Sequence, residues 1–446
     1  MNQVLYRLEK RHWLSFSLMI LVLSALFLIS DGLQADEQTD QRPADWKDRL
    51  EKLRAVPYIG VSQTPVGDQG SGVMFFDPKR ACSGYYLYCN RLTGDAFLMD
   101  VAGEVVHRWT WSPKRKTNSE PDIMLDDYAV MLENGDLLVM KKFMEVLRLN
   151  WNSRVLWSKS LDVHHELVQA LDGSLYILLR ELRDYRGLFL RNDIIAHLAC
   201  DGHEIDRWRA QDHLAELGQV FDDRWFLDTI LNSGQDAGEL GNLVKRVEGR
   251  VRSARSGKQP FDYFHINAIT PIPPTPLQEI DPRFEAGNLL VCFRNINQIA
   301  VVEKETYRVL WTWGAGELEW PHHPTILEDG HILLFDNGVN RRYSRVLELD
   351  PLTGVIVWQY QADPQRDFFS DTRGSAQRLP NGNTLILESN KGRAFQVTDE
   401  GEVVWEWLNP RVDAVYRGKP HRETVYRMYH YPSEQVDPLL QRWWWQ

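Results

Sequence analysis

The stretch HPTILEDGHILLFDN, from His323 to Asn337, consists of an apolar-alternating run, an Asp-Gly pair and a second apolar run. An Asp-Gly or Asn-Gly pair between two such runs is the strongest short sequence signal for a β-hairpin. Three other stretches repeat the pattern: YAVMLENGDLLVMK (128–141), HELVQALDGSLYILLR (165–180) and GSAQRLPNGNTLILES (374–389). Each is followed by a second hairpin that ends in an aromatic strand. The chain is therefore predicted to repeat a unit of four strands.

The tryptophans that close these units give the period of the repeat. They stand 47 to 51 residues apart, except for one interval about twice as long: Trp109, Trp157, Trp208, Trp311, Trp358 and Trp405. This period is the size of a four-stranded propeller blade. The six endings predict an all-β fold, a six-bladed β-propeller over residues 67–446, closed by pairing of N- and C-terminal strands. The long interval, after Trp208, is predicted to hold a polar, helical insertion at about residues 211–260.

The N-terminal segment has the pattern of a membrane anchor or a signal peptide. Residues 13–30, WLSFSLMILVLSALFLIS, carry no charge and follow a basic flank. A run of this length is just enough to span a bilayer with the basic flank in the cytoplasm. A signal peptide cleaved after Ala35 is the alternative. Residues 1–35 are thus predicted to be an anchor or signal segment and residues 36–66 a linker.

The predicted location follows from this segment. We expect a single-pass protein of the bacterial inner membrane with its propeller in the periplasm, or a periplasmic protein if the segment is cleaved. The net charge of −11 over 446 residues argues against a nucleic-acid partner. In an oxidising compartment, Cys82 and Cys89 are close enough in sequence to form a disulfide across a local loop. Cys200 and Cys292 lie in apolar runs and are predicted to be buried thiols, and none of the four cysteines has zinc-site spacing.

The open ends of the first hairpins carry polar side chains. With two-residue turns, residues equidistant from a turn face each other across the strands. The expected pairs are Asp127 with Lys142, His165 with Arg180, His322 with Asn337, and Gly374 with Ser389, while His265 opens the fourth unit with Arg294 at the equivalent place. The first strand of each blade lines the central channel, so these side chains should converge at one mouth of it. Gly374 and Ser389 are the smallest and are expected to leave room for a ligand.

Histidines and arginines without a carboxylate cluster suit a tetrahedral oxyanion. Arginine presents forked donors to sulfate or phosphate, and a neutral histidine can attack the central atom. The alternative function of three such histidines is to bind a zinc ion. The neighbouring arginines disfavour a metal cation, so we expect neither a metal ion nor a cofactor.

At these residues the sequence resembles a known family, the bacterial periplasmic arylsulfate sulfotransferases, which are six-bladed propellers. The resemblance runs from about Gly84 to Pro410. It is carried by HHELVQALDG (164–173), FHINAI (264–269), FRNINQIAVVE (293–303), HHPTILEDGHILLFDNG (322–338), GSAQRLPNGNTLILE (374–388) and GEVVWEWLNP (401–410). The resemblance implies transfer of a sulfuryl group from a phenolic sulfate ester to a phenol, without a nucleotide sulfate donor, through a sulfated histidine.

The resemblance also implies roles for single residues. The nucleophile falls on His322, although His323 follows it directly and the choice between the two stays open. His165, His265 and Arg294 are expected to be catalytic. Substrate contacts are expected from Asn267, Asn337, Arg180, His323 and His164. The partners are then an aryl sulfate donor, a phenolic acceptor and the membrane, and the sequence leaves open whether the chain forms a homo-oligomer.

Two other functions compete with this hypothesis. A non-catalytic, membrane-anchored propeller scaffold would have the same repeat. A quinoprotein-like dehydrogenase would also show periodic tryptophans, but its calcium site needs carboxylates, and among the predicted axial side chains only Asp127 supplies one.

Overall fold

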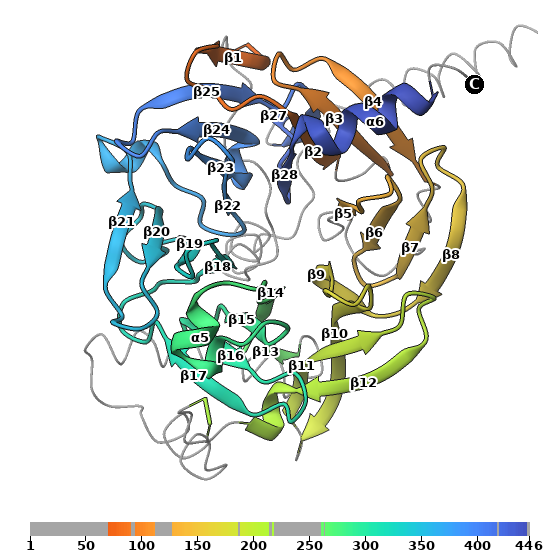
Figure 1. Ribbon diagram of the computed structural model, residues 1–446, viewed down its shortest axis with the longest axis vertical. Coiled ribbons are helices and arrows are strands. Elements are labelled where there is room, and N and C mark those ends of the chain that lie inside the picture. Colours follow the sequence, from red (N-terminus) through yellow and green to blue (C-terminus); the bar gives the residue numbers. More distant parts are fainter. Residues whose placement is uncertain are drawn as a thin grey trace, which may run out of the picture. The chain divides into compact units, whose positions relative to one another are not determined.

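The predicted six-bladed propeller is confirmed. The structure is a computed structural model that describes residues 70–90, 94–111, 127–185, 188–213, 216–217, 260–262, 264–416 and 419–443. These residues form six antiparallel sheets of four or five strands, arranged as blades around one axis (Figure 1). We number the blades by their closing tryptophans, from Trp109 in blade 1 to Trp405 in blade 6.

From the axis outward, the strands are β28 (Met428–Tyr431), β2 (Tyr85–Asn90), β3 (Asp95–Asp100) and β4 (Val105–Thr110) in blade 1; β5 (Asp127–Met131), β6 (Leu137–Lys141), β7 (Glu145–Leu149) and β8 (Val155–Ser160) in blade 2; β9 (Val163–Gln169), β10 (Leu175–Tyr185), β11 (Leu188–Leu198) and β12 (Glu204–Arg209) in blade 3; β14 (Ile266–Pro271), β15 (Leu289–Phe293), β16 (Gln298–Val302) and β17 (Val309–Trp313) in blade 4; β18 (His322–Ile326), β19 (Ile332–Asp336), β20 (Arg345–Leu349) and β21 (Ile356–Tyr360) in blade 5; and β22 (Ser375–Arg378), β23 (Thr384–Glu388), β24 (Arg393–Val397) and β25 (Val403–Leu408) in blade 6. The remaining elements are β1 (Gly72–Phe76), β13 (Phe261–Asp262), β26 (Val412–Tyr416), β27 (Lys419–Arg422), α5 (Leu277–Ile280), α6 (Ser433–Trp443), η2 (Ala210–His213), η3 (Pro282–Phe284), η4 (Gln365–Asp367) and η5 (Ser389–Lys391).

Blade 1 closes the ring with strands from both ends of the chain, as expected. The C-terminal strand β28 pairs antiparallel with β2, with Tyr85 opposite Tyr431. The N-terminal strand β1 adds a fifth strand to blade 6 by pairing with β25. The two ends of the propeller therefore hold each other through backbone hydrogen bonds between residues far apart in sequence.

Three of the six periodic tryptophans bond their blade to the next one. The indole N–H of Trp208 donates to the carbonyl of Tyr307 at 3.0 Å, in the last turn of the following blade. Trp358 and Trp405 make the same bond to Asp399 and Val101, at 2.7 Å in both cases. A buried indole N–H needs an acceptor, and the turn of the next blade supplies one at each of these three steps. At Trp109 and Trp157 the buried indole nitrogen has no hydrogen-bond partner among the described residues, so this contact accounts for the tryptophan at three of the six blades.

The first hairpins turn through three residues, which corrects the two-residue turns expected from the sequence. In blade 2 the Leu132 amide donates to Asp136 and the Gly135 amide donates to Leu132. Gly135 has φ +85°, the left-handed position of a three-residue hairpin loop with a bulge. The extra residue shifts the register by one, so Asp127 faces Lys141 and the predicted pairing with Lys142 is wrong.

Cys82 and Cys89 form no disulfide, contrary to the prediction. Both are buried thiols. Cys89 lies in the extended strand β2 (Tyr85–Asn90), and the sulfur of Cys82, before this strand, lies 3.9 Å from Nε2 of His430 instead. Cys292 is a buried thiol as predicted, but Cys200 is exposed, so the prediction that it is buried is wrong.

Two further predictions lie mostly or entirely outside the described residues. The anchor or signal segment (1–35) and the linker (36–66) are not among them, and no helix in the part of the chain that is described is long and apolar enough to cross a membrane. The insertion does fall between β12 of blade 3 and β14 of blade 4. Of residues 211–260, the structure describes 211–213, 216–217 and 260, and η2 ends at His213.

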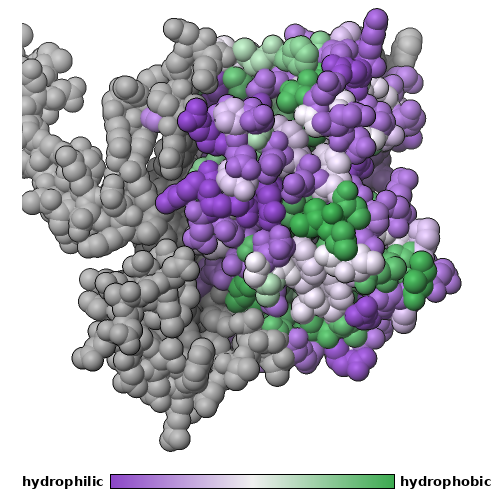
Figure 2. Space-filling model, turned by 90° about the vertical axis from the view of Figure 1, so that its left-hand side faces the viewer, coloured by the Kyte–Doolittle hydropathy of each residue, from purple (hydrophilic) through white to green (hydrophobic). Residues whose placement is uncertain are grey.

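The outer strands of the blades present one face to solvent. From the side of the ring that carries β21, the described surface is mostly hydrophilic, with separate hydrophobic patches (Figure 2). Val357 on β21 and Val355 just before it are exposed, whereas Tyr360 on the same strand is buried. A ligand site that the protein encloses must therefore lie near the axis or between strands of neighbouring blades.

Candidate active site

The innermost strands of blades 3, 4 and 5 have β-bulges at or near histidines. Three residues of β9, from His164 to Glu166, stand opposite one residue of β10. In β18, His323 and Pro324 stand opposite Leu334, and Asn267 is the extra residue in β14. A bulge twists a strand and redirects its side chains. His165 and His323 stand on these bulges, whereas His265 directly precedes β14, and the rings of His165 and His265 are in contact.

Three of these histidines have left-handed backbones. The φ angles are +60° at His165, +49° at His265 and +49° at His323. This conformation costs about 1 kcal/mol or more for a residue other than glycine, and such strain gathers at functional sites. Its recurrence at three blades marks this end of the strands as the candidate site.

The histidines are buried and close to arginines. The rings of His165 and His265 lie 4.6 Å apart between centroids. Burial, followed by the charge of Arg294, holds the pKa of His322 and of His265 well below the usual value near 6.5. Burial and Lys142 likewise lower the pKa of His165, and burial and Arg427 lower that of His323. At neutral pH these imidazoles are therefore uncharged and keep a nitrogen lone pair.

The hydrogen bonds of His322 fix its tautomer. Its Nδ1 lies 2.6 Å from Asn337 Oδ1 and 3.0 Å from the carbonyl oxygen of Trp320. Asn337 uses its amide nitrogen on the carbonyls of Ser370 and Arg373, both at 2.6 Å, so its oxygen faces the histidine. Two acceptors around Nδ1 require a hydrogen there, which leaves the lone pair on Nε2. The expected contact between His322 and Asn337 is present, although His322 faces Phe335 in the strand register.

His323 points to a different neighbour. Its Nδ1 lies 3.1 Å from the carbonyl oxygen of Ala376 in blade 6, and its ring lies 5.9 Å from that of Tyr429. Arg427 is the charged group that lowers its pKa, whereas Arg294 and Arg427 both act on His322. Of the two, His322 is the one that shares its arginine with His265.

Two arginines supply positive charge to the histidines. Arg294 follows β15 directly opposite His265, as the sequence predicts, and its guanidinium lies 4.7 Å from the ring centroid of Trp320. Arg427, just before β28, was not predicted. It donates to the carbonyl oxygen of Gly374 at 2.8 Å and to Glu166 at 3.3 Å, and it is 3% exposed. The strand that closes the ring thus adds a cation to the site.

A network of buried charges lies behind His165 and His265. Arg191 on β11 donates to Asp193 at 2.7 Å and to Asp262 at 3.1 Å. Asp262 in turn lies 2.5 Å from Nδ1 of His265. His164 belongs to this network, because its ring nitrogens lie within 3.3 Å of Arg191 and Asp193. Its side chain is fully buried and its Nδ1 lies 2.7 Å from Nδ1 of His165, so His164 is placed to position His165.

Several predicted neighbours take other partners. The bulge in β9 moves His165 away from Arg180, so the predicted pairing is wrong; Arg180 forms two 2.9 Å bonds with Asp162 and stacks on Phe143 at 3.6 Å. Asn267 donates to the carbonyl of Pro321 at 2.8 Å, so it anchors the backbone before His322 and does not orient an imidazole. Gly374 leaves no room for a ligand at its Cα, because a Cβ there would lie 2.6 Å from the Phe335 ring.

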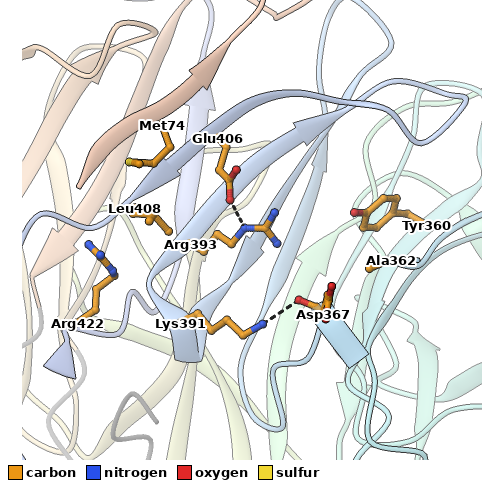
Figure 3. Close-up of a pocket in the computed structure, with 9 residues that line it drawn as sticks. All are labelled: Met74, Tyr360, Ala362, Asp367, Lys391, Arg393, Glu406, Leu408 and Arg422. Atoms are coloured by element: carbon orange, nitrogen blue, oxygen red, sulfur yellow. Dashed lines mark hydrogen bonds and ion pairs between the residues drawn. The ribbon is translucent and has the colours of Figure 1, made fainter. Parts of the chain in front are cut away.

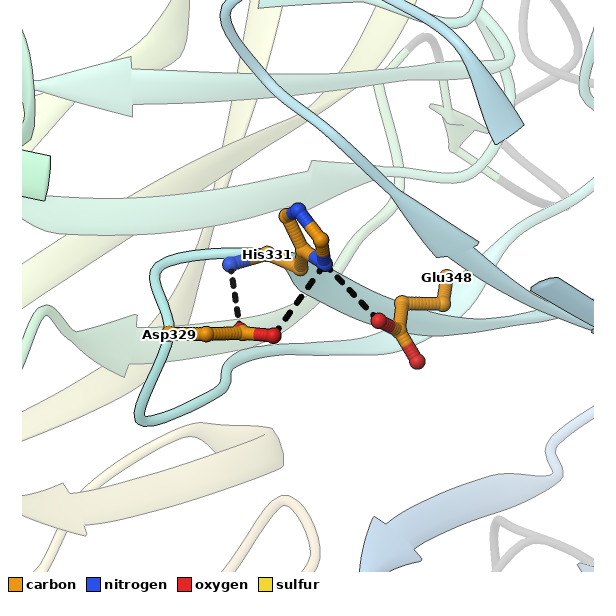
Figure 4. A group of neighbouring side chains, drawn as sticks. All are labelled: Asp329, His331 and Glu348. Carbon is orange, nitrogen blue, oxygen red and sulfur yellow. Dashed lines mark hydrogen bonds and ion pairs between the residues drawn. The ribbon is translucent and has the colours of Figure 1, made fainter. Parts of the chain in front are cut away.

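One histidine cluster lies away from this site. His331, in the turn between β18 and β19, places Nδ1 at 2.8 Å from Glu348 and 3.2 Å from Asp329 (Figure 4). The second oxygen of Glu348 pairs with Arg378 at 2.6 Å. Both carboxylates converge on one nitrogen and a cation occupies the far side, so ion pairing accounts for this cluster.

The comparisons with known proteins agree with the fold and place the chain in a family. The arylsulfotransferase (ASST) family model matches residues 129–410. This match covers more than half of the chain, so the protein belongs to the arylsulfotransferase family. Comparison with curated protein sequences gives no match.

Three similar solved structures have sequences distant from this one. A protein of unknown function from Bacteroides caccae aligns with a TM-score of 0.43 and 14% identity, over 78% of this chain and all of the other. A streptogramin B lyase aligns with a TM-score of 0.41 and 10% identity, over 83% and 95% of the two chains. The Myceliophteria thermophila Cps50 (Swd1) propeller domain gives 0.41 and 11%, over 78% and 89%. Likenesses at this level say nothing of function.

Proposed function

We propose that the protein transfers a sulfuryl group from an aryl sulfate ester to an aromatic hydroxyl through a sulfated histidine. The observation that carries the proposal is the neutral imidazole of His322, whose Nδ1 is held by two acceptors beside Arg294 and His265. A buried, uncharged imidazole with its lone pair on Nε2 is a competent nucleophile. The family to which the chain belongs supports the choice of an aryl substrate.

In the first half-reaction, Nε2 of His322 attacks the sulfur of the donor. The N–S bond forms, the bond from sulfur to the aryl oxygen breaks, and the phenolate leaves with the bonding electrons. Positive charge then grows on the imidazole. Its Nδ1 hydrogen points at Asn337 Oδ1 and the Trp320 carbonyl, which stabilise that charge.

In the second half-reaction, a phenol attacks the same sulfur and returns His322 to its neutral form. The hydroxyl proton needs a base, and His265 is suited to this because its Nδ1 lies 2.5 Å from the carboxylate of Asp262. Asp262 stabilises the imidazolium that forms when Nε2 accepts the proton. His265 then releases that proton to solvent, which balances the proton that the released phenolate takes up, so both imidazoles are neutral before the next turnover.

The oxygens of the sulfuryl group need donors as charge spreads over them. Arg294 in blade 4 and Arg427 before β28 of blade 1 are the charged groups that lower the pKa of His322. The ring of His165 lies beside that of His265. We assign the two arginines to the sulfuryl oxygens, and we assign His165 to the donor's remaining polar atoms.

The assay that tests the function uses para-nitrophenyl sulfate as donor and phenol as acceptor. Release of nitrophenol should depend on phenol and should yield phenyl sulfate in equal amount, with ping-pong kinetics. A scaffold protein would release nothing. Release without phenyl sulfate would indicate hydrolysis, and dye reduction in place of release would favour a dehydrogenase.

Replacing Arg294 should slow transfer without unfolding the protein. In Arg294→Ala, kcat should fall by about 100- to 1,000-fold, the usual cost of removing one donor to a developing oxyanion. Arg294→Lys keeps the charge and should recover part of the loss. Arg283→Ala is the matched control, because Arg283 forms its ion pair with Asp281 in η3, away from the histidines. A larger effect on KM than on kcat would assign Arg294 to substrate binding alone.

A further inference from the structure

A cavity lies at the outer edge of blade 6, and no histidine of the candidate site lines it. It has a volume of about 440 Å³ and opens between β21, β24, β25 and the C-terminal hairpin β26–β27 (Figure 3). Its apolar side chains lie at two ends, with Met74 and Leu408 near Arg422, and Tyr360 and Ala362 opposite them (Figure 3). Its charged side chains are Asp367, Lys391, Arg393, Glu406 and Arg422. The volume is within the usual range for a small-molecule site.

Arg422 is the unusual residue of this cavity. Its side chain is 2% exposed, yet its guanidinium donates only to backbone carbonyls, those of Asn409 and Gly70. Among the described residues, no carboxylate forms a hydrogen bond or ion pair with it. Burial without such a partner lowers the pKa of Arg422. A buried charge of this kind is costly unless an opposite charge approaches it.

The other cations of the cavity are already neutralised. Arg393 pairs with Glu406 at 2.5 Å and with Glu388 at 3.3 Å. Lys391 pairs with Glu388 at 2.5 Å and donates to the Asp367 carbonyl oxygen at 2.9 Å. In Figure 3, the pair Arg393–Glu406 lies between Arg422 and the apolar side chain of Tyr360. The cavity thus has one uncompensated positive charge at one end and an aromatic ring at the other.

We propose that this cavity binds an amphipathic monoanion, in which a carboxylate or sulfonate group meets Arg422 and a compact apolar body lies against Met74, Leu408 and Tyr360. The planar guanidinium matches the two oxygens of such a head group. Arg422 also joins β27 to Gly70 near the N-terminal strand β1, so the bound anion lies where the two chain ends meet on blade 6. The site is separate from the sulfuryl-transfer site and does not depend on it.

The test measures binding of para-fluorobenzoate to the full-length protein by fluorine NMR. The wild type should bind it, and the neutral para-fluorobenzyl alcohol should bind about tenfold more weakly or not at all. Arg422→Met should weaken benzoate binding by about tenfold or more. Ala362→Trp, which fills the cavity and leaves Arg422 in place, should abolish binding.

Two controls separate this site from general charge effects and from the axis. Arg366→Met removes a cation that is 86% exposed next to the cavity and should leave binding unchanged. His322→Ala should also leave it unchanged. The proposal is overturned if Ala362→Trp binds as well as the wild type, if the alcohol binds equally tightly, if Arg366→Met weakens binding as much as Arg422→Met, or if His322→Ala abolishes it. Should Arg422→Met not fold, as judged by its thermal unfolding, Ala362→Trp decides alone.

Discussion

His322→Ala should lower sulfuryl transfer by about four orders of magnitude or more, the scale expected when a covalent nucleophile is removed. No other group in the site combines a lone pair on Nε2 with two acceptors on Nδ1 and two adjacent arginines. The measurement is the acceptor-dependent release of nitrophenol. In parallel, wild-type protein quenched with donor alone should carry one additional SO₃ group on the peptide that contains His322, detectable by mass spectrometry.

His323→Ala is the matched control, because it removes the neighbouring imidazole and leaves the Asn337 contact intact. Its activity should stay within about tenfold of the wild type, since His323 contacts the Ala376 carbonyl and not Asn337. An SO₃ adduct on His323, together with an active His322→Ala protein, would show that His323 and not His322 is the nucleophile. If His322→Ala is active and no SO₃ adduct forms on His322 of the wild type or on His323, transfer does not proceed through a covalent intermediate on either histidine.

Asn337→Ala examines the orientation of the nucleophile separately from its presence. The imidazole of His322 remains, but its Nδ1 loses the partner at 2.6 Å and keeps only the Trp320 carbonyl. The tautomer with the lone pair on Nε2 is then less strongly favoured. A fall in kcat without loss of the SO₃ adduct would identify Asn337 as a positioning residue.

The fold was predictable from the sequence because two repeating features define it. The Asn-Gly and Asp-Gly turns give the hairpins, and Trp208, Trp358 and Trp405 recur because each bonds to the next blade. The register was less predictable. The Asn134-Gly135 pair is compatible with two- and three-residue loops, and the difference moves the cross-strand partner of Asp127 from Lys142 to Lys141. The prediction of a disulfide was wrong because Cys89 lies within an extended strand, whereas a local disulfide loop needs a chain that turns back between its cysteines.

Site residues that recur at the same position in several blades were predictable from the sequence. Site residues that occur in a single blade were not. His165, His265 and His322 share a position before the hairpin turn, so one pattern finds all three. Arg427 has no counterpart in other blades, because β28 reaches the axis only by closing the ring. Its one sequence signal is a charge within the apolar and aromatic run TVYRMYHY (424–431). Arg191 and Asp193 carry the same signal in LFLRNDIIAHL (188–198), but the sequence does not reveal that their partner is Asp262, about 70 residues away.

The same buried histidines should make the protein lose stability in mild acid. In the folded state, burial and nearby cations hold the pKa values of His165, His265, His322 and His323 well below 6.5. In the unfolded chain each histidine titrates near 6.5. Above that pH neither state binds the proton, and the histidines do not affect the free energy of unfolding. Below it only the unfolded state does, so stability falls as pH falls, by about 1.4 kcal/mol per histidine per pH unit.

These four histidines together should lower the free energy of unfolding by roughly 5 kcal/mol per pH unit below 6.5, until the folded-state pKa values are reached. Burial also lowers the pKa values of His107, His164, His197 and His430, which add to the same slope. Urea unfolding followed by tryptophan fluorescence at pH 7.5, 6.5 and 5.5 measures this, and the window lies above the range in which ordinary carboxylates titrate. In His323→Gln one titrating group is gone, so the slope below pH 6.5 should flatten by about 1.4 kcal/mol per pH unit. A free energy of unfolding that is constant between pH 7.5 and 5.5 would mean that the imidazoles accept protons in the folded protein, and a neutral nucleophile at His322 would then no longer be supported.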